Sequence, residues 1–145
     1  MIALDTNLLV YAHRSDSPFH GPAKELLESL RRQPSPWAIP WPCLHEFVAV
    51  VTHPKVFKTP TPIEACFACI DAWHAGDNLH LIGESDGYLG KLHRIATAAQ
   101  LRGPLIHDAR VAAICLHHGV GELWSADRDF SAFPQLKVRN PLVKR

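Results

Sequence analysis

The chain has 145 residues, of which 47% are hydrophobic, so it has the length of one ordinary domain and can bury a core. Its 15 basic and 14 acidic residues give a formal net charge of +1, which neither favours nor excludes a polyanionic partner. No apolar run approaches the ~20 residues that span a bilayer, and the chain begins on a strand pattern instead of a signal segment. We therefore expect a soluble, cytoplasmic protein with one domain over residues 1–145 and no membrane partner.

The first seven residues carry the clearest signal, because a short apolar run stops at Asp5, Thr6 and Asn7. Such a run is typical of a central parallel strand that is buried on both faces. In open α/β sheets, ligands bind beyond the carboxyl ends of the strands, and Asp5 falls at such an end. Asp5 is equally suited to cap a helix predicted over residues 7–13, so this stretch alone leaves both interpretations open.

Strand and helix patterns alternate along the rest of the chain. Apolar residues at helical spacing predict helices over residues 22–33, 42–53, 62–74, 85–102 and 106–119. Short apolar runs predict strands over residues 37–39, 79–82, 122–125 and 136–138, the last at a sheet edge. Thr61, in a capping box with Glu64, and Ser85 are expected to cap the helices that follow them. The alternation predicts one parallel sheet flanked by helices.

Two apolar stripes, over residues 44–51 and 66–73, offer more apolar surface than one small sheet is expected to cover, and this predicts a symmetric homodimer. The second stripe includes Cys66 and Cys69, which share a helical face. A structural zinc site would need a second close cysteine pair, which the sequence lacks. We expect the two thiols to pack in the core, with a redox or metal role as the alternative.

Three further acids fall near element ends: Asp127 follows the strand at 122–125, Asp108 opens the helix at 106–119, and Glu46 lies in the helix at 42–53. Right-handed crossovers can bring such positions to one sheet edge with Asp5. Carboxylates ~5 Å apart repel by roughly 3 kcal/mol per pair at an effective dielectric near 20, and hard divalent cations relieve that repulsion. The acids therefore predict a Mg²⁺ or Mn²⁺ site suited to phosphodiester hydrolysis.

Taken together, the stretches 4–7, 107–113 and 125–130 and an inward-facing Glu46 resemble the PIN-domain family. More narrowly, they resemble the VapC-type ribonuclease toxins of bacterial toxin-antitoxin pairs. The resemblance implies an α/β/α sandwich with four to five mostly parallel strands and a Mg²⁺- or Mn²⁺-dependent endoribonuclease acting on RNA. It also implies a homodimer and a small VapB-type antitoxin that occupies the site.

Carried over by position, the resemblance assigns the catalytic and metal-binding acids to Asp5, Glu46, Asp108 and Asp127. It assigns accessory roles to Thr6, Asn7, Ser125 and Asp129. Thr6 and Asn7 match hydrogen-bonding positions behind the first acid, and Ser125 stands where the family commonly has threonine, so a hydroxyl is retained. Arg110, also accessory, suits either phosphate binding or a structural ion pair.

Three alternatives compete with this interpretation. An aspartyl-phosphate phosphatase would want a second acid where Asn7 stands and a lysine near the site. A catalytically silent RNA-binding module would be expected to lack one of the acids, and all are present. A DNA substrate stays open, because metal-held phosphate chemistry does not itself distinguish the sugars. The RNA species, the cleavage sequence, the number of metal ions and the antitoxin are not determined by the sequence.

Overall fold

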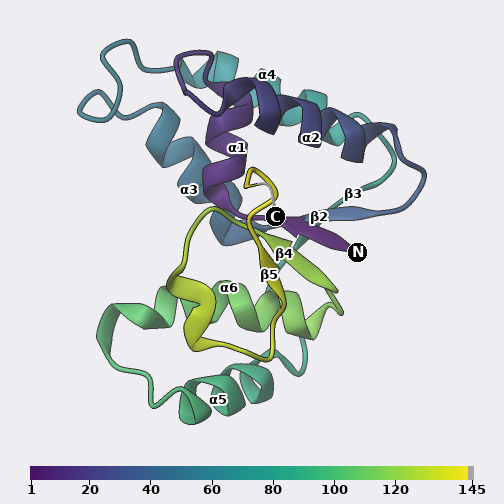
Figure 1. Cartoon of the computed structure of the whole chain (residues 1–145), viewed down its shortest axis with the longest axis vertical. Coiled ribbons are helices and arrows are strands. Elements are labelled where there is room, and N and C mark those ends of the chain that lie inside the picture. The colour runs from purple at the N-terminus through teal and green to yellow at the C-terminus, as the bar shows by residue number, and fades with distance from the viewer. Residues whose placement is uncertain (144–145) are drawn as a thin grey trace.

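The computed structural model describes residues 1–143 and contains a five-stranded parallel sheet with helices on both faces (Figure 1). Its strands are β1 (Ile2–Leu4), β2 (Trp37–Pro40), β3 (Leu79–Ile82), β4 (Glu122–Trp124) and β5 (Val138–Arg139). They lie in the order β3-β2-β1-β4-β5, and every neighbouring pair is parallel. The predicted α/β/α sandwich is confirmed, and β5 lies at an edge as expected.

The strand order reverses at β1, which is the central strand. The chain runs outward from β1 through β2 to β3 and then returns to place β4 on the other side of β1. Leu4 pairs with Trp124, and the Asp5 N–H donates to the Trp124 carbonyl at 3.0 Å. The residues that follow β1 and β4, Asp5 and Ser125, are therefore neighbours at the switch point, where open parallel sheets bind ligands.

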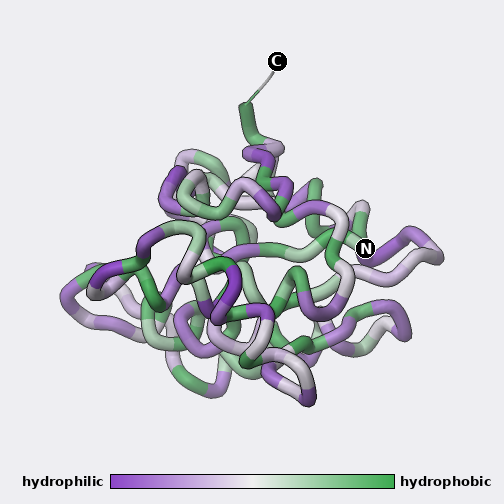
Figure 2. The backbone as a smooth tube through the Cα atoms, turned by 90° about the horizontal axis from the view of Figure 1, so that it is seen from below, coloured by the Kyte–Doolittle hydropathy of each residue, from purple (hydrophilic) through white to green (hydrophobic). Residues whose placement is uncertain are grey.

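Helices cover the sheet in two layers, visible above and below it in Figure 1. One layer contains α1 (Thr6–His13), α2 (His20–Arg32), α3 (Trp41–Val51) and α4 (Ile63–His74). The other contains α5 (Tyr88–Ala98) and α6 (Ile106–His117), and two short 3-10 helices are η1 (Gly103–Leu105) and η2 (Asp129–Ala132). Hydrophilic stretches colour several of the outermost loops in Figure 2. None of the helices within residues 1–143 is long and apolar enough to cross a membrane.

Helix α6 lies close against the sheet because its inner face is built from small residues. Ala109, Ala112 and Ala113 are fully buried. The helix ends as its glycine predicts: Gly119 has φ +69, and the Val120 N–H donates to the Cys115 carbonyl at 2.9 Å. This close packing fixes the start of α6, and with it Asp108, near the strand ends.

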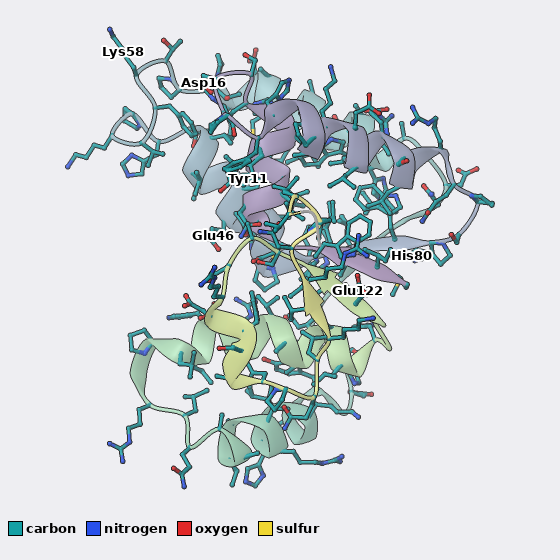
Figure 3. All side chains as sticks on the ribbon, viewed as in Figure 1. Tyr11, Asp16, Glu46, Lys58, His80 and Glu122 are labelled. Carbon is teal, nitrogen blue, oxygen red and sulfur yellow. The ribbon has the colours of Figure 1, made fainter. Side chains whose placement is uncertain are left out.

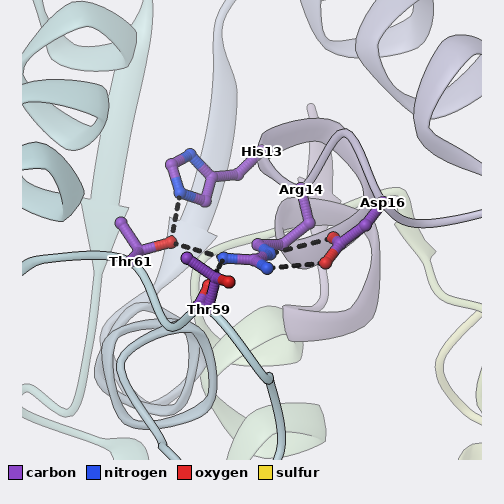
Figure 4. A network of polar contacts seen from close by, with 5 residues as sticks. All are labelled: His13, Arg14, Asp16, Thr59 and Thr61. Carbon is purple, nitrogen blue, oxygen red and sulfur yellow. Dashed lines mark hydrogen bonds and ion pairs between the residues drawn. The ribbon is translucent and has the colours of Figure 1, made fainter.

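The predicted capping box at Thr61 is wrong. Helix α4 begins at Ile63 with no side-chain cap, and the Thr61 hydroxyl instead contacts α1 and the residue after it (Figure 4). Thr61 Oγ1 lies 3.0 Å from His13 Nε2 and accepts from Arg14 Nη1 at 3.2 Å. Arg14 also donates to the Thr59 carbonyl at 2.8 Å. The hydroxyl thus ties the loop of residues 52–62 to the end of α1.

Ser85 was likewise expected to cap the helix after it, and it does not. Helix α5 begins at Tyr88, after Gly87 in a left-handed conformation with φ +93. The Ser85 hydroxyl lies 2.7 Å from His117 Nε2, at the end of α6. As with Thr61, a tertiary partner has replaced the local one. Helix α2 also begins earlier than predicted, at His20 instead of residue 22.

The apolar stripes that led to the homodimer prediction lie in the core of the single chain. Leu44, Phe47, Val51, Cys66, Ile70 and Trp73 are all buried. The buried faces of these two segments therefore do not provide a dimer surface. Cys66 is buried and Cys69 is half-buried, both as free thiols, and burial raises the pKa of Cys69 to about 11. Core packing thus holds fully for Cys66 and in part for Cys69.

Candidate functional site

A crevice of about 610 Å³ opens at the carboxyl ends of β1 and β4. Four predicted acids line it from four parts of the chain: the end of β1, α3, α6 and the loop after β4. The predicted site residues on its wall are Asp5, Thr6, Asn7, Glu46, Asp108, Arg110 and Asp127. The remaining two lie next to it: the buried Ser125 donates to Asp5, and the N–H of the exposed Asp129 donates to Asp127. Long-range folding has thus gathered acids that are far apart in sequence.

The Asp5 carboxylate is held from several sides and is only 7% exposed. Its Oδ1 accepts from the Thr6 N–H at 2.8 Å and from the Cys43 thiol at 3.3 Å, while Oδ2 accepts from the Ser125 hydroxyl at 2.7 Å. Burial raises the pKa of Asp5, although these donors act to lower it. Asp5 both caps α1 and lines the crevice, so the two interpretations of the sequence hold together.

The Ser125 hydroxyl joins the first acid to the last. Besides donating to Asp5, it accepts from the Asp127 N–H at 2.9 Å and from Asn7 Nδ2 at 3.2 Å. Asn7 Oδ1 in turn accepts from the Ala126 N–H at 3.1 Å. The hydroxyl expected at this position is therefore fully used, and it fixes Asp5 and Asp127 relative to each other.

Glu46 is exposed at the crevice instead of facing inward, which corrects the expectation from the sequence. Figure 3 shows it near Tyr11, which also lines the crevice. Thr6 Oγ1 lies 3.3 Å from both Glu46 Oε2 and the Cys43 carbonyl. The start of α1 therefore contacts α3 through one hydroxyl, and Glu46 keeps an oxygen free toward the crevice.

The tightest group of carboxylates is Asp108, Asp127 and Asp129, which each offer an oxygen within 4.8 Å of the others. Asp127 Oδ1 also accepts from the Asp129 N–H at 2.9 Å. Burial, followed by the negative charges of Asp127, Asp129, Asp5 and Glu46, raises the pKa of Asp108 to about 6. These hard oxygen donors fit Mg²⁺ or Mn²⁺, whose charge would relieve the repulsion.

Arg110 does not neutralise this group. Its Nε donates to Glu84 Oε2 at 2.8 Å, and both side chains are substantially exposed. Burial acts to raise the pKa of Glu84, but the hydrogen bond from Arg110 holds it below its usual value. Arg110 therefore forms the ion pair that one interpretation expected, although its partner is Glu84 and not a crevice acid.

Two features of the site were missed at the sequence level. Cys43 was not among the predicted site residues, yet its thiol donates to Asp5, and burial and the charge of Asp5 raise its pKa well above the ordinary value. Its position three residues before Glu46, on the same side of α3, was the available signal. His45 and His107 also line the crevice. Each directly precedes an acid in the sequence, which spacing alone does not mark as significant.

The fold and the crevice together define an α/β protein with a cluster of acids at the carboxyl edge of a parallel sheet. A family model for the PIN domain matches residues 2–136, and the chain belongs to the PIN-domain family. Ribonuclease VapC48 of Mycobacterium tuberculosis is 34% identical to it over 137 residues, covering 94% of each chain.

Solved structures show the same fold. VapBC2 from Rickettsia felis, bound to a DNA fragment from its promoter, gives a TM-score of 0.69 at 21% identity, over 96% of this chain and 98% of that one. VapC20 of Mycobacterium tuberculosis, described as a sarcin-ricin loop cleaving toxin, gives a TM-score of 0.65 at 18% identity, over 91% of this chain and 94% of that one.

Proposed function

We propose that residues 1–145 form a single nuclease domain that cleaves RNA with a bound Mg²⁺ or Mn²⁺ and acts as the toxin of a toxin-antitoxin pair in the cytoplasm. The observation that carries this proposal is the gathering of Asp5, Glu46, Asp108 and Asp127 around one crevice. The names of its relatives, among them a VapC ribonuclease at 34% identity, support RNA as the substrate.

In this proposal Asp5, Asp108 and Asp127 hold the cation, with Glu46 and Asp129 contributing oxygens beside them. Held there, a divalent cation would supply Lewis-acid chemistry: contact with phosphate oxygens, a lower pKa for water and stabilisation of the leaving oxygen. The donors on Asp5 keep its carboxylate in a fixed orientation, so little reorganisation accompanies binding. Ser125 and Asn7 position the loop that carries Asp127 and take no direct part in the chemistry.

The direct test incubates the purified chain with matched single-stranded RNA and DNA oligonucleotides. We expect RNA cleavage with Mg²⁺ or Mn²⁺, none in excess chelator, and recovery when the metal is restored. Undiminished cleavage in chelator would rule out the metal. Preferred cleavage of the DNA would establish the alternative substrate, and no cleavage of either would favour a silent binding module.

The proposed inhibitor is a VapB-type antitoxin that places a basic residue, an arginine, in the acidic crevice. A guanidinium can bond two carboxylate oxygens at once and does not lose its charge, so it would compete with the cation. Substituting the antitoxin's arginines one at a time should weaken inhibition at one position, and added Mg²⁺ should lower its affinity. If neither occurs, inhibition does not involve the acidic crevice.

The homodimer also stays a proposal, but its surface differs from the buried faces on which the sequence prediction relied. Ile63 and Phe67 lie one turn apart on α4 and are 52% and 50% exposed, so they offer an apolar face that the core leaves uncovered. Sedimentation at micromolar concentration should give a dimer, and Phe67→Asp should give a monomer. A chain that is already monomeric without the substitution contradicts the proposal.

A further inference from the structure

Trp41 is a large aromatic residue exposed on the edge of the sheet that carries the acids. It is the first residue of α3, it directly follows β2, and it is 41% exposed. Because β2 is the neighbour of β1, the backbone at Trp41 lies one strand spacing, ~4.8 Å, from the line of β1, and Asp5 directly follows β1. The contacts within the core do not explain why this position exposes a tryptophan.

The indole of Trp41 is held in place from two sides. Gly83 follows β3 in register with it, since Pro40 pairs with Ile82. A Cβ on Gly83 would lie 3.0 Å from Trp41 Cδ1, so the glycine allows close packing there. On the helix side, the His45 ring lies 5.9 Å from the indole, tilted by 40°. An aromatic ring that is already oriented loses little entropy when a ligand stacks on it.

We propose that Trp41 is the stacking surface for a nucleobase of the RNA whose phosphodiester lies at the acidic crevice, with His45 between the base and the acids. The proposal rests on the proposed RNA cleavage and names a residue that selects unpaired bases. Sequence-tolerant recognition of single-stranded RNA relies on such aromatic surfaces. His45 lines the crevice next to Glu46, so it connects the two parts of the site.

The surroundings of Trp41 favour a base over an apolar side chain of a protein partner. Along α3 the residues after it on the crevice side are His45 and Glu46, and both are exposed. Glu84 directly follows Gly83 and forms an exposed ion pair with Arg110. An apolar side chain would remove these polar groups from water and offer them no hydrogen bond, whereas a base has polar edges that bond to them or to water.

The test compares two end-labelled probes of equal length: a single-stranded RNA and a ribose-phosphate chain without bases. The full chain carries Asp108→Asn throughout, so that the RNA is not cleaved. We expect Trp41→Ala to weaken RNA binding about 5- to 150-fold, the range for losing one base stack. It should leave binding of the abasic chain within about twofold. Trp41→Phe should retain most of the RNA affinity.

Leu89→Ala is the matched control, because Leu89 is 74% exposed on α5 and contributes to neither the crevice nor the indole. Equal losses with both probes, or no loss with either, would overturn the inference. The inference would also be overturned if Trp41→Ala weakened binding to the antitoxin but not to RNA, because Trp41 would then be a contact for a protein. Cleavage by the unsubstituted chain is measured separately. If that chain cleaves RNA but Trp41→Ala does not weaken RNA binding, the inference about Trp41 is refuted and the proposed RNA cleavage stands.

Discussion

The acidic crevice and the loop of residues 52–62 use charge in opposite ways. Beside the loop, Arg14 donates two hydrogen bonds to Asp16, at 3.0 and 2.6 Å. These hydrogen bonds lower the pKa of Asp16. In the crevice, acid faces acid, and burial together with the charge of Asp127 raises the pKa of Asp108 to about 6. The charges of Arg14 and Asp16 are satisfied within the chain, whereas the crevice's charges call for a cation from outside.

Asp108→Asn should have the largest effect, because it removes charge from the crevice and keeps the shape of the side chain. We expect RNA cleavage to fall roughly 100-fold or more, with the fold intact. Asp71→Asn, at an exposed acid on α4, is the control and should leave cleavage unchanged. Asp5→Asn is a weaker test, since both Asp5 oxygens accept hydrogen bonds and an amide would lose one. Full activity of Asp108→Asn would show that the site is assigned wrongly.

Ser125→Ala comes next, because it leaves the crevice acids in place but removes the hydroxyl that connects Asp5 with Asp127. Loss of such a supporting bond typically costs about 10- to 100-fold in metal affinity or activity. Titration of Mg²⁺ against cleavage rate should show the loss, and Ser125→Thr should restore the rate. Equal rates for Ser125→Ala and the unsubstituted chain would mean that the hydroxyl has no positioning role.

The raised pKa of Asp108 predicts a pH dependence of stability in the presence of chelator. The folded chain holds this proton up to about pH 6, whereas the unfolded chain releases it near 3.8. The free energy of unfolding should therefore fall as pH rises between these values, by about 1 kcal/mol after allowance for solvent screening. Urea unfolding at pH 4 and 8 measures this, and Asp108→Asn should reduce the difference. If the difference in unfolding free energy between the two pH values is as large in the Asp108→Asn chain as in the unsubstituted chain, the prediction is contradicted.

Arg14→Met tests the other region and should have the smallest effect on function. It removes the bond to the Thr59 carbonyl and keeps part of the packing over Phe57, whose ring centroid lies 4.0 Å from the guanidinium carbon. We expect a loss of about 1 kcal/mol in the free energy of unfolding and faster proteolysis in the loop of residues 52–62. RNA cleavage should stay within about twofold. A large loss of cleavage would show that the two regions are coupled.

The sequence by itself determined the parallel sheet and the acids, because both depend on local patterns. Short apolar runs ending in polar residues specify buried strands, and an acid placed after such a strand, like Asp5 or Asp127, falls at the carboxyl edge in any parallel sheet.

Only the tertiary structure decided which partner each polar group takes and which apolar stripe stays exposed. Thr61 and Ser85 have local capping positions open to them, yet their hydroxyls contact Arg14 and His117 from distant elements. Cys43 gained a role through Asp5, 38 positions away in sequence. A hydroxyl or thiol bonds whichever partner the packed chain brings within reach, and local spacing carries no information about that competition.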